Sequence, residues 1–195
     1  PARKMAMTQL GNGLFSAKHY EDALSVEEAE LSTMRRLGAP EGEVLVVQAN
    51  LANSYRMLGR YESALRIKRE VYARKSALCG SLHESTLISA VNLASSLVDD
   101  LQQFDEAKAF LLDRMPVSIR VLGKAHTTTY ILQRMYAQCL YQNDGASRSD
   151  LTEAVAKLED LDRRCTRIYG AAHPQTVCTR HHLERALLAL AHKRA

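Results

Sequence analysis

Four short segments of the chain repeat one pattern of residue types at a nearly constant spacing. Each begins with a large side chain and ends with alanine, and the four starting positions are Tyr20, Tyr61, Phe104 and Leu151. These positions are separated by 41, 43 and 47 residues. Periods of this size indicate supersecondary units that stack on one another, because a single unit cannot bury its own hydrophobic face. The repeat therefore predicts an array of stacked units rather than one closed globule.

A second signature, Gly-x-x-His-x-x-Thr, recurs between these segments at residues 80–86, 123–129 and 170–176. Glycine commonly ends a helix because it adopts the left-handed conformation without strain. We expect the imidazole to fill the turn that follows and to bond a free group at a helix end. The residues predicted to form these structural joints between repeats are Gly80, His83, Gly123, His126, Gly170 and His173.

The composition favours an all-α protein. Of the 195 residues, 46% are hydrophobic, which is enough for a continuous core, whereas only 6% are aromatic and four are proline. Strand-rich folds favour aromatic and β-branched residues and frequent turn breakers. The net charge of +4 comes from 26 basic and 22 acidic residues scattered along the chain, without the clustered basic block of a nucleic-acid site.

The second repeat shows the expected helices most clearly. Apolar residues recur at steps of three and four over residues 44–58, which predicts an amphipathic helix that stops near Gly59. A second helix is expected over residues 61–78. Ser81, with Glu84 three residues later, predicts a capping box at the start of the next helix.

Alignment of the repeats places a small residue at equivalent positions of each helix pair. Side chains no larger than glycine or alanine allow two helices to approach within about 8 to 10 Å. The small residues are Gly11, Ala52, Ala94 and Ala137 on the first helices and Ala23, Ala64, Ala107 and Ala154 on the second helices.

Two departures from the repeat affect the expected structure. Pro116 falls inside the expected second helix of the third unit, so we expect a kink or a break near Met115. The fourth unit carries a polar insertion at residues 142–149, which lengthens the turn between its helices and predicts a mobile surface loop.

These features resemble the tetratricopeptide repeat (TPR), with its Tyr-x-x-Ala middle and its turn after the second helix. The longer period and the joint at residues 122–129 are most similar to the roughly 42-residue repeats of kinesin light chains and related proteins. The resemblance implies an α-solenoid of about four antiparallel helical hairpins plus a terminal helix, coiled as a right-handed superhelix. Residues 1–195 would form one domain, with units at about residues 1–40, 41–82, 83–125, 126–172 and 173–195.

The same resemblance implies a concave groove lined by the first helices. The positions that would face it are Asn12, Phe15, Asn53, Arg56, Met57, Ser95, Val98, Arg134, Gln138, Tyr141 and Arg185. Asn12 and Asn53 coincide with asparagines that hold a peptide carboxylate in clamp-type family members. Thr8, Val91 and Ser95 stand where such a clamp would have basic residues, so the clamp is incomplete.

The sequence carries no motif for catalysis, phosphate binding or metal binding, so neither an enzyme nor a cofactor is expected. The joint histidines of successive units would lie on the order of 10 Å apart or more. Nitrogen ligands of zinc lie about 2 Å from the metal, so the histidines cannot share an ion. The four cysteines lack a paired spacing, which favours free thiols and a reducing compartment such as the cytoplasm. No membrane span or targeting signal is visible, and a start at Pro1 suggests a trimmed chain.

The first functional hypothesis is a non-catalytic adaptor that binds an extended peptide in the groove. Asparagine amides can pair with a peptide backbone whatever its sequence, and Arg56, Arg134 and Arg185 favour an acidic partner. Two alternatives stay open. One is a structural subunit packed permanently in a larger assembly, and the other is single-stranded nucleic-acid binding by helical repeats, which the scattered charge does not favour.

Overall fold

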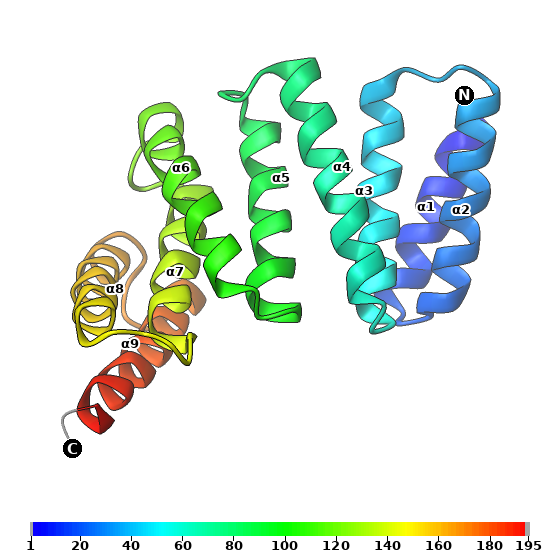
Figure 1. Cartoon of the computed structure of the whole chain (residues 1–195). Helices are drawn as coiled ribbons and strands as arrows, with labels where there is room; N and C mark the ends of the chain where they lie inside the picture. Colours follow the sequence, from blue (N-terminus) through cyan, green and yellow to red (C-terminus); the bar gives the residue numbers. More distant parts are fainter. Residues whose placement is uncertain (1, 194–195) are drawn as a thin grey trace. The chain divides into compact units, whose positions relative to one another are not determined.

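Every regular element within the described part of the chain is helical (Figure 1). The computed structural model describes residues 2–193, with side chains from residue 6 onward. The helices are α1 (Ala2–Ser16), α2 (Tyr20–Arg36), α3 (Glu41–Met57), α4 (Tyr61–Cys79), α5 (Glu84–Ser95), α6 (Phe104–Leu122), α7 (Thr127–Gln142), α8 (Arg148–Tyr169) and α9 (Pro174–His192), and a π-helical turn, η1 (Ser96–Asp100), continues α5. The predicted all-α class is confirmed.

Two units divide the chain, residues 1–96 and residues 97–195. The first contains α1 to α5 and the second contains α6 to α9. In each unit every helix packs against the next helix along the chain, and neighbouring helices run in opposite directions (Figure 1). Each unit is therefore built of stacked antiparallel hairpins, as the α-solenoid prediction requires. The continuity of one array over residues 1–195 stays a prediction.

Small residues hold the helices close together. The alanines that end the four repeated tetrads are fully buried, and so are the alanines predicted at the crossing positions of α3, α5 and α7. In the first repeat this position is Gly11, where a Cβ atom would lie 3.4 Å from Cγ of Glu27. Glycine therefore leaves room for Glu27 to pack across α1. The largest fully buried aliphatic side chains include Leu45 and Leu87 in the first unit and Leu111, Leu132, Leu140 and Leu158 in the second.

The glycines of the three joints share one backbone conformation. Gly80, Gly123 and Gly170 follow α4, α6 and α8 with φ of 90°, 85° and 89° and ψ of 154°, 164° and 164°. This combination is not the left-handed helical conformation that we expected. It lies in a region that is essentially restricted to glycine, which explains the glycine at each joint more strongly than a helix end alone does.

The histidine of each joint caps the helix that follows. Nδ1 of His83, His126 and His173 accepts the backbone N–H two residues later, at 3.1, 3.2 and 3.2 Å. The imidazole thus satisfies one of the amides that a helix start leaves without an internal partner. The predicted capping box at Ser81 is wrong, because α5 begins at Glu84 with His83 as its cap.

The threonine of the signature ties the new helix back to the old one. The Thr86 hydroxyl donates to the Gly80 carbonyl at 2.9 Å, and the Thr176 hydroxyl donates to the Gly170 carbonyl at 2.8 Å. Both threonines are buried. The three recurring residues of the signature therefore carry three separate tasks: a special backbone conformation, a helix cap and a bond across the turn.

The helix with the internal proline is not broken. α6 runs without interruption from Phe104 to Leu122 through Pro116, so the predicted break near Met115 is absent. Pro116 is exposed, and its ring and missing N–H therefore disturb no packed neighbour. The hydroxyl of Ser118 donates to the Met115 carbonyl at 2.8 Å, which satisfies a carbonyl close to the proline.

The polar insertion of the fourth unit is held by its own side chains. Oδ1 of Asn143 accepts the Gly145 N–H at 3.0 Å. Ser147 and Asp150 then form a reciprocal capping box at the start of α8. Asp150 also pairs with Lys108 of α6 at 2.7 Å, so the loop is anchored at the end that enters α8.

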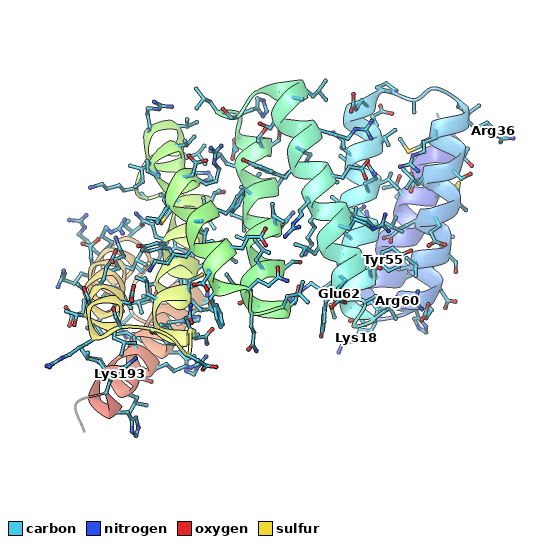
Figure 2. All side chains as sticks on the ribbon, viewed as in Figure 1. Lys18, Arg36, Tyr55, Arg60, Glu62 and Lys193 are labelled. Carbon is cyan, nitrogen blue, oxygen red and sulfur yellow. The ribbon has the colours of Figure 1, made fainter. Side chains whose placement is uncertain are left out.

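The turns before the second helices of the first three repeats each contain one residue with positive φ. These residues are Lys18 with φ of 64°, Gly59 with φ of 73° and Gln102 with φ of 53°. Figure 2 shows Lys18 at the same end of the first unit as Arg60, which follows Gly59. Only one of the three turns uses glycine, so the left-handed conformation is imposed by the hairpin and not by the local residue type.

Candidate functional site

The first unit contains a small polar cavity between its first three helices. Its volume is about 50 Å³, and its lining residues are Asn12 and Phe15 of α1, Glu27 of α2, and Asn50 and Asn53 of α3. Asn12 is exposed and Phe15, Asn50 and Asn53 are half-buried, whereas Glu27 is buried. The asparagines therefore form the mouth of the cavity and the glutamate forms its floor.

Three of the predicted groove residues of this unit thus come together, and three do not line the cavity. Asn12 and Asn53 share it with Phe15, and the Asn50 amide donates to the Asn12 side-chain oxygen at 3.3 Å. Phe15 packs edge-on against Tyr20, with ring centroids 5.3 Å apart. Outside the cavity lie Arg56 and Ser95, which are half-buried, and Met57, which is exposed.

The second unit contains a buried polar network around His182 of α9. Nη1 of Arg134 lies 2.8 Å from Nε2 of His182 and 3.1 Å from Oε1 of Gln138. On the other side of the ring, Nδ1 of His182 lies 2.7 Å from the Tyr141 hydroxyl. Gln138 also donates to Oδ1 of Asp99 at 3.1 Å. The network joins α7, α9 and the π-helical turn.

The hydrogen bonds determine the protonation state of His182. Arginine can only donate, so Nε2 of His182 accepts from Arg134, and a neutral imidazole then carries its proton on Nδ1 and donates to Tyr141. Burial, together with the nearby cations Arg134 and Arg185, lowers the pKa of His182 to about 4. Burial also raises the pKa of Tyr141 to about 12. Both groups are therefore neutral at physiological pH, and Arg134 serves the network.

Arg185 is the exposed cation beside this network. Its guanidinium carbon lies 5.6 Å from the centre of the Tyr141 ring. It borders an open cavity of about 300 Å³ that Gln142 and Tyr141 also line. Gln142 can accept from Nε2 of Gln138 at 2.9 Å, or, with its amide turned over, from Arg185 at 2.7 and 3.0 Å. The first orientation sets the Gln142 amide nitrogen against the Arg185 donors, so the turned-over amide is the better orientation for Arg185.

The burial of other predicted groove residues in the second unit needs correction. Val98 is 1% exposed, because it lies in the buried π-helical turn and not on an open helix face. Gln138 and Tyr141 are 6% and 7% exposed, so they support the network more than they offer free surface. Among the predicted residues of this unit, Arg185 alone is exposed, and Arg134 is half-buried.

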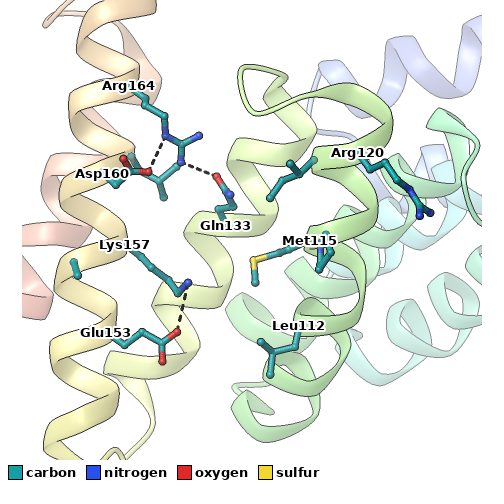
Figure 3. A pocket seen from close by; sticks show the side chains of 12 residues that line it. Leu112, Met115, Arg120, Gln133, Glu153, Lys157, Asp160 and Arg164 are labelled. Carbon is teal, nitrogen blue, oxygen red and sulfur yellow. Dashed lines mark hydrogen bonds and ion pairs between the residues drawn. The ribbon is translucent and has the colours of Figure 1, made fainter.

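A larger cavity of about 680 Å³ lies between α6 and α8, beside α7 (Figure 3). Leu112 and Met115 of α6 point toward it, and Arg120 of the same helix also lines it. The charges along α8 are paired with one another, Lys157 with Glu153 at 3.4 Å and Arg164 with Asp160 at 2.9 Å. None of the predicted groove residues lines this cavity. Its walls are mainly apolar. Because the charges at its rim are paired with one another, they favour neither an anionic nor a cationic ligand.

Sequence reasoning missed Glu27, Asn50 and His182. Glu27 had a readable signal, because it occupies the position seven residues after the start of a tetrad, where Leu111 and Leu158 of later units are fully buried. Asn50 lies one helical turn before Asn53 and so shares its face. His182 had no signal beyond its residue type.

The described residues contain no metal-binding cluster, no disulfide and no helix able to span a membrane. No group of three or more histidine, cysteine or acidic side chains between residues 2 and 193 is arranged to hold a metal ion. All four cysteines are free thiols, with Cys139 and Cys165 buried and Cys79 and Cys178 exposed. Over the same residues, none of the helices combines the length and the hydropathy that a membrane crossing requires.

Comparison with known proteins identifies the repeat. Residues 43–117 match the tetratricopeptide repeat family model. No curated protein is significantly similar to the chain. Among solved structures, the chain is similar to a Podosopora anserina protein described as a kinesin light chain with nearly identical TPR-like repeats. A point variant of that protein is 22% identical with a TM-score of 0.81, and the match covers 100% of this chain and 89% of that one.

A second structure of the same Podosopora anserina protein gives 21% identity and a TM-score of 0.79, covering 100% of this chain and 90% of that chain. BtubC (BKLC) from P. vanneervenii is 15% identical with a TM-score of 0.62, over 97% of this chain and 80% of that chain. At these identities the likeness concerns the fold. The resemblance read from the sequence is thus confirmed: residues 43–117 are a tetratricopeptide repeat segment, and the chain as a whole has the fold of kinesin light chain-like TPR proteins.

Proposed function

We propose that the chain is a non-catalytic protein-interaction scaffold that binds an extended acidic peptide segment. The TPR fold supports the general role, because stacked helical hairpins present an extended surface that suits another polypeptide. Fold alone does not assign a partner. The finer part of the proposal therefore rests on the side chains of the two units.

One observation carries the preference for an acidic partner. Arg185 is exposed and borders an open cavity of about 300 Å³, where the Gln142 oxygen, with its amide turned over, accepts from the guanidinium at 2.7 and 3.0 Å. A guanidinium has five N–H donors, so this exposed group can also donate to a carboxylate of a ligand, and a charge-assisted hydrogen bond is roughly twice as strong as a neutral one. Arg134 holds the network behind this site through His182. The cavity is therefore prepared for an anionic group.

A reducing intracellular compartment is the setting that we propose for this scaffold. Cys79 and Cys178 are exposed free thiols, and unpaired exposed thiols persist best where glutathione and thioredoxin keep them reduced.

Fluorescence anisotropy with an array of labelled ten-residue peptides tests the proposal. Each acidic peptide is paired with an analogue in which Gln and Asn replace Glu and Asp. We expect acidic peptides to bind at least about tenfold more tightly than their neutral analogues, a difference of about 1.4 kcal/mol. Arg185→Gln should remove this preference, because it deletes the cation at the cavity.

Arg167→Gln is the matched control. Arg167 is also exposed but lies on α8 and does not line this cavity, so its loss should leave the preference unchanged. Equal binding of acidic and neutral peptides to the wild type, or no binding of any peptide, would overturn the proposal. A preference that falls equally in both variants would mean that net charge alone attracts the peptides.

A further inference from the structure

The floor of the cavity in the first unit is the buried carboxylate of Glu27. Glu27 is 3% exposed, and its carboxylate has a hydrogen-bond partner in the Ser54 hydroxyl, although the geometry is too poor to satisfy Oε2 or the hydroxyl fully. A buried polar atom without a partner costs free energy, and a buried charge costs more. Native structures keep such atoms rarely, so this one calls for an explanation.

The carboxylate is not simply misplaced in the core, because it opens into a space of defined size. The cavity of about 50 Å³ corresponds to roughly four water-sized positions at about 10 to 15 Å³ each. A guanidinium group has four heavy atoms and matches that space. The half-buried asparagines at the mouth leave a route to the floor from solvent.

The lining residues favour a ligand that donates hydrogen bonds. The carboxylate of Glu27 can only accept when ionised, and each asparagine offers a side-chain oxygen that accepts. Arginine has five N–H donors and no acceptor, and its flat guanidinium also stacks on aromatic rings. Phe15 supplies such a ring in the cavity wall.

Neighbouring charges agree with this ligand. Burial raises the pKa of Glu27, a hydrogen bond from the Ser54 hydroxyl opposes this effect, and the adjacent carboxyl of Glu30 raises the pKa further. Glu30 is itself buried and accepts from Thr8 of α1. A cation in the cavity would compensate for both carboxylates, which are three residues apart on α2.

We propose that this cavity receives the guanidinium group of an arginine side chain of a bound polypeptide, with Glu27 as the ion-pairing residue and Asn12, Asn50 and Asn53 as hydrogen-bond acceptors. The inference deepens the proposed function, on which it rests for the ligand being a peptide. It adds a requirement for one basic residue to the acidic preference of the second unit.

Two-dimensional NMR of the full chain tests the proposal with N-acetyl-arginine amide as the probe and N-acetyl-citrulline amide as its neutral isostere. We expect arginine amide to shift the side-chain amide signals of Asn50 and Asn53 and to bind at least about tenfold more tightly than citrulline amide. Glu27→Gln should bring the two affinities together, because the isosteric amide keeps the shape of the floor and removes its charge.

Glu28→Gln is the matched control, since it makes the same substitution one residue later at an exposed position and should leave the arginine selectivity intact. Circular dichroism confirms that each variant is folded. If Glu27→Gln does not fold, Phe15→Leu replaces it, and loss of the ring should weaken arginine binding at least about threefold. Equal binding of arginine and citrulline to the wild type, or arginine selectivity that survives both Glu27→Gln and Phe15→Leu, would overturn the assignment.

The outcomes also separate this inference from the proposed function. If the acidic-peptide preference of Arg185 is found but Glu27→Gln has no effect on arginine binding, the scaffold proposal stands and the arginine cavity is refuted. If arginine amide binds through Glu27 while no acidic peptide binds, the cavity stands and the acidic-peptide proposal is refuted.

Discussion

Replacement of Gly80 by alanine should destabilise the first unit by about 1 to 3 kcal/mol. The cost arises from backbone conformation alone, because a Cβ atom built at Gly80 has no neighbour within 4 Å. The bonds of the joint stay available, with the Gly80 N–H to the Ser76 carbonyl at 3.0 Å and the Thr86 hydroxyl to the Gly80 carbonyl at 2.9 Å. Urea unfolding followed by far-UV circular dichroism measures the change. With a slope of about 1 to 3 kcal/mol per molar urea, the midpoint should fall by about 1 M.

Gly13→Ala provides a control of opposite sign in the same unit. Gly13 lies inside α1, and a Cβ atom there also has no neighbour within 4 Å. Its φ is not positive, so alanine should stabilise the helix by about 0.5 to 1 kcal/mol. The two variants should therefore differ by about 1.5 to 4 kcal/mol in the free energy of unfolding. Equal effects of both substitutions would refute the view that the positive φ of Gly80, with its ψ of 154°, restricts this joint to glycine.

Three further predictions concern single residues. Gln102→Gly should be neutral or stabilise the second unit by up to about 1 kcal/mol in urea unfolding, because a left-handed residue other than glycine costs about 1 to 2 kcal/mol and the added chain entropy of glycine offsets only part of this. Burial lowers the pKa of His182 to about 4 from 6.5, so the unfolded chain binds the proton first and stability should fall by roughly 1 to 3 kcal/mol as the pH drops from 6.5 toward 4. This pH dependence should disappear in His182→Asn, and its survival there would contradict the assignment. Burial raises the pKa of Glu27 above 4.5, so its ionised form destabilises the fold at pH 7. Glu27→Gln should therefore raise the free energy of unfolding at pH 7 and have a smaller effect near pH 4.5. Thermal unfolding at both pH values measures the difference.

The helical fold could be predicted from the sequence because its signals are local and periodic. The predicted stop near Gly59 agrees with the end of α3 at Met57, and the helix expected over residues 61–78 is α4, Tyr61–Cys79. The capping box at Ser81 was wrong because the His83 imidazole supplies the same acceptor two residues later in the chain. Of the kink or break expected near Met115, the break is absent, because Pro116 and Leu112, whose carbonyl loses its helical partner, both lie on the exposed side of α6. In both cases the surroundings of the residue, a histidine cap at Ser81 and solvent exposure at Pro116, outweighed the local rule.

The candidate sites were less predictable because they depend on which polar groups remain unpaired after folding. The sequence pattern placed Asn12 and Asn53 on a common surface, and both line one cavity. It could not show that Arg134 donates a hydrogen bond to His182. Among the predicted groove residues of the second unit, Arg185 is therefore the cation that remains exposed. Nor could it show that Val98 would be buried, since a π-helical turn shifts the register of side chains after Ser95. Register shifts and hydrogen-bond partners depend on tertiary contacts, so they cannot be read from the spacing of residues in the sequence.

The repeat itself gives a reason to regard Glu27 as functional. Counting seven residues from the start of each tetrad reaches Glu27, Lys68, Leu111 and Leu158. The two leucines are fully buried, so an aliphatic side chain satisfies the packing of this position. Lys68 is 5% exposed and hydrogen-bonds the Ser96 hydroxyl at 2.8 Å, whereas the Ser54 hydroxyl reaches the Glu27 carboxylate only with poor geometry, which leaves Oε2 unsatisfied. A charged residue at a position that the fold fills with leucine lowers stability, and proteins retain such costs mainly at sites that bind or react. The departure of Glu27 from its own repeat therefore supports a ligand that supplies a cationic partner.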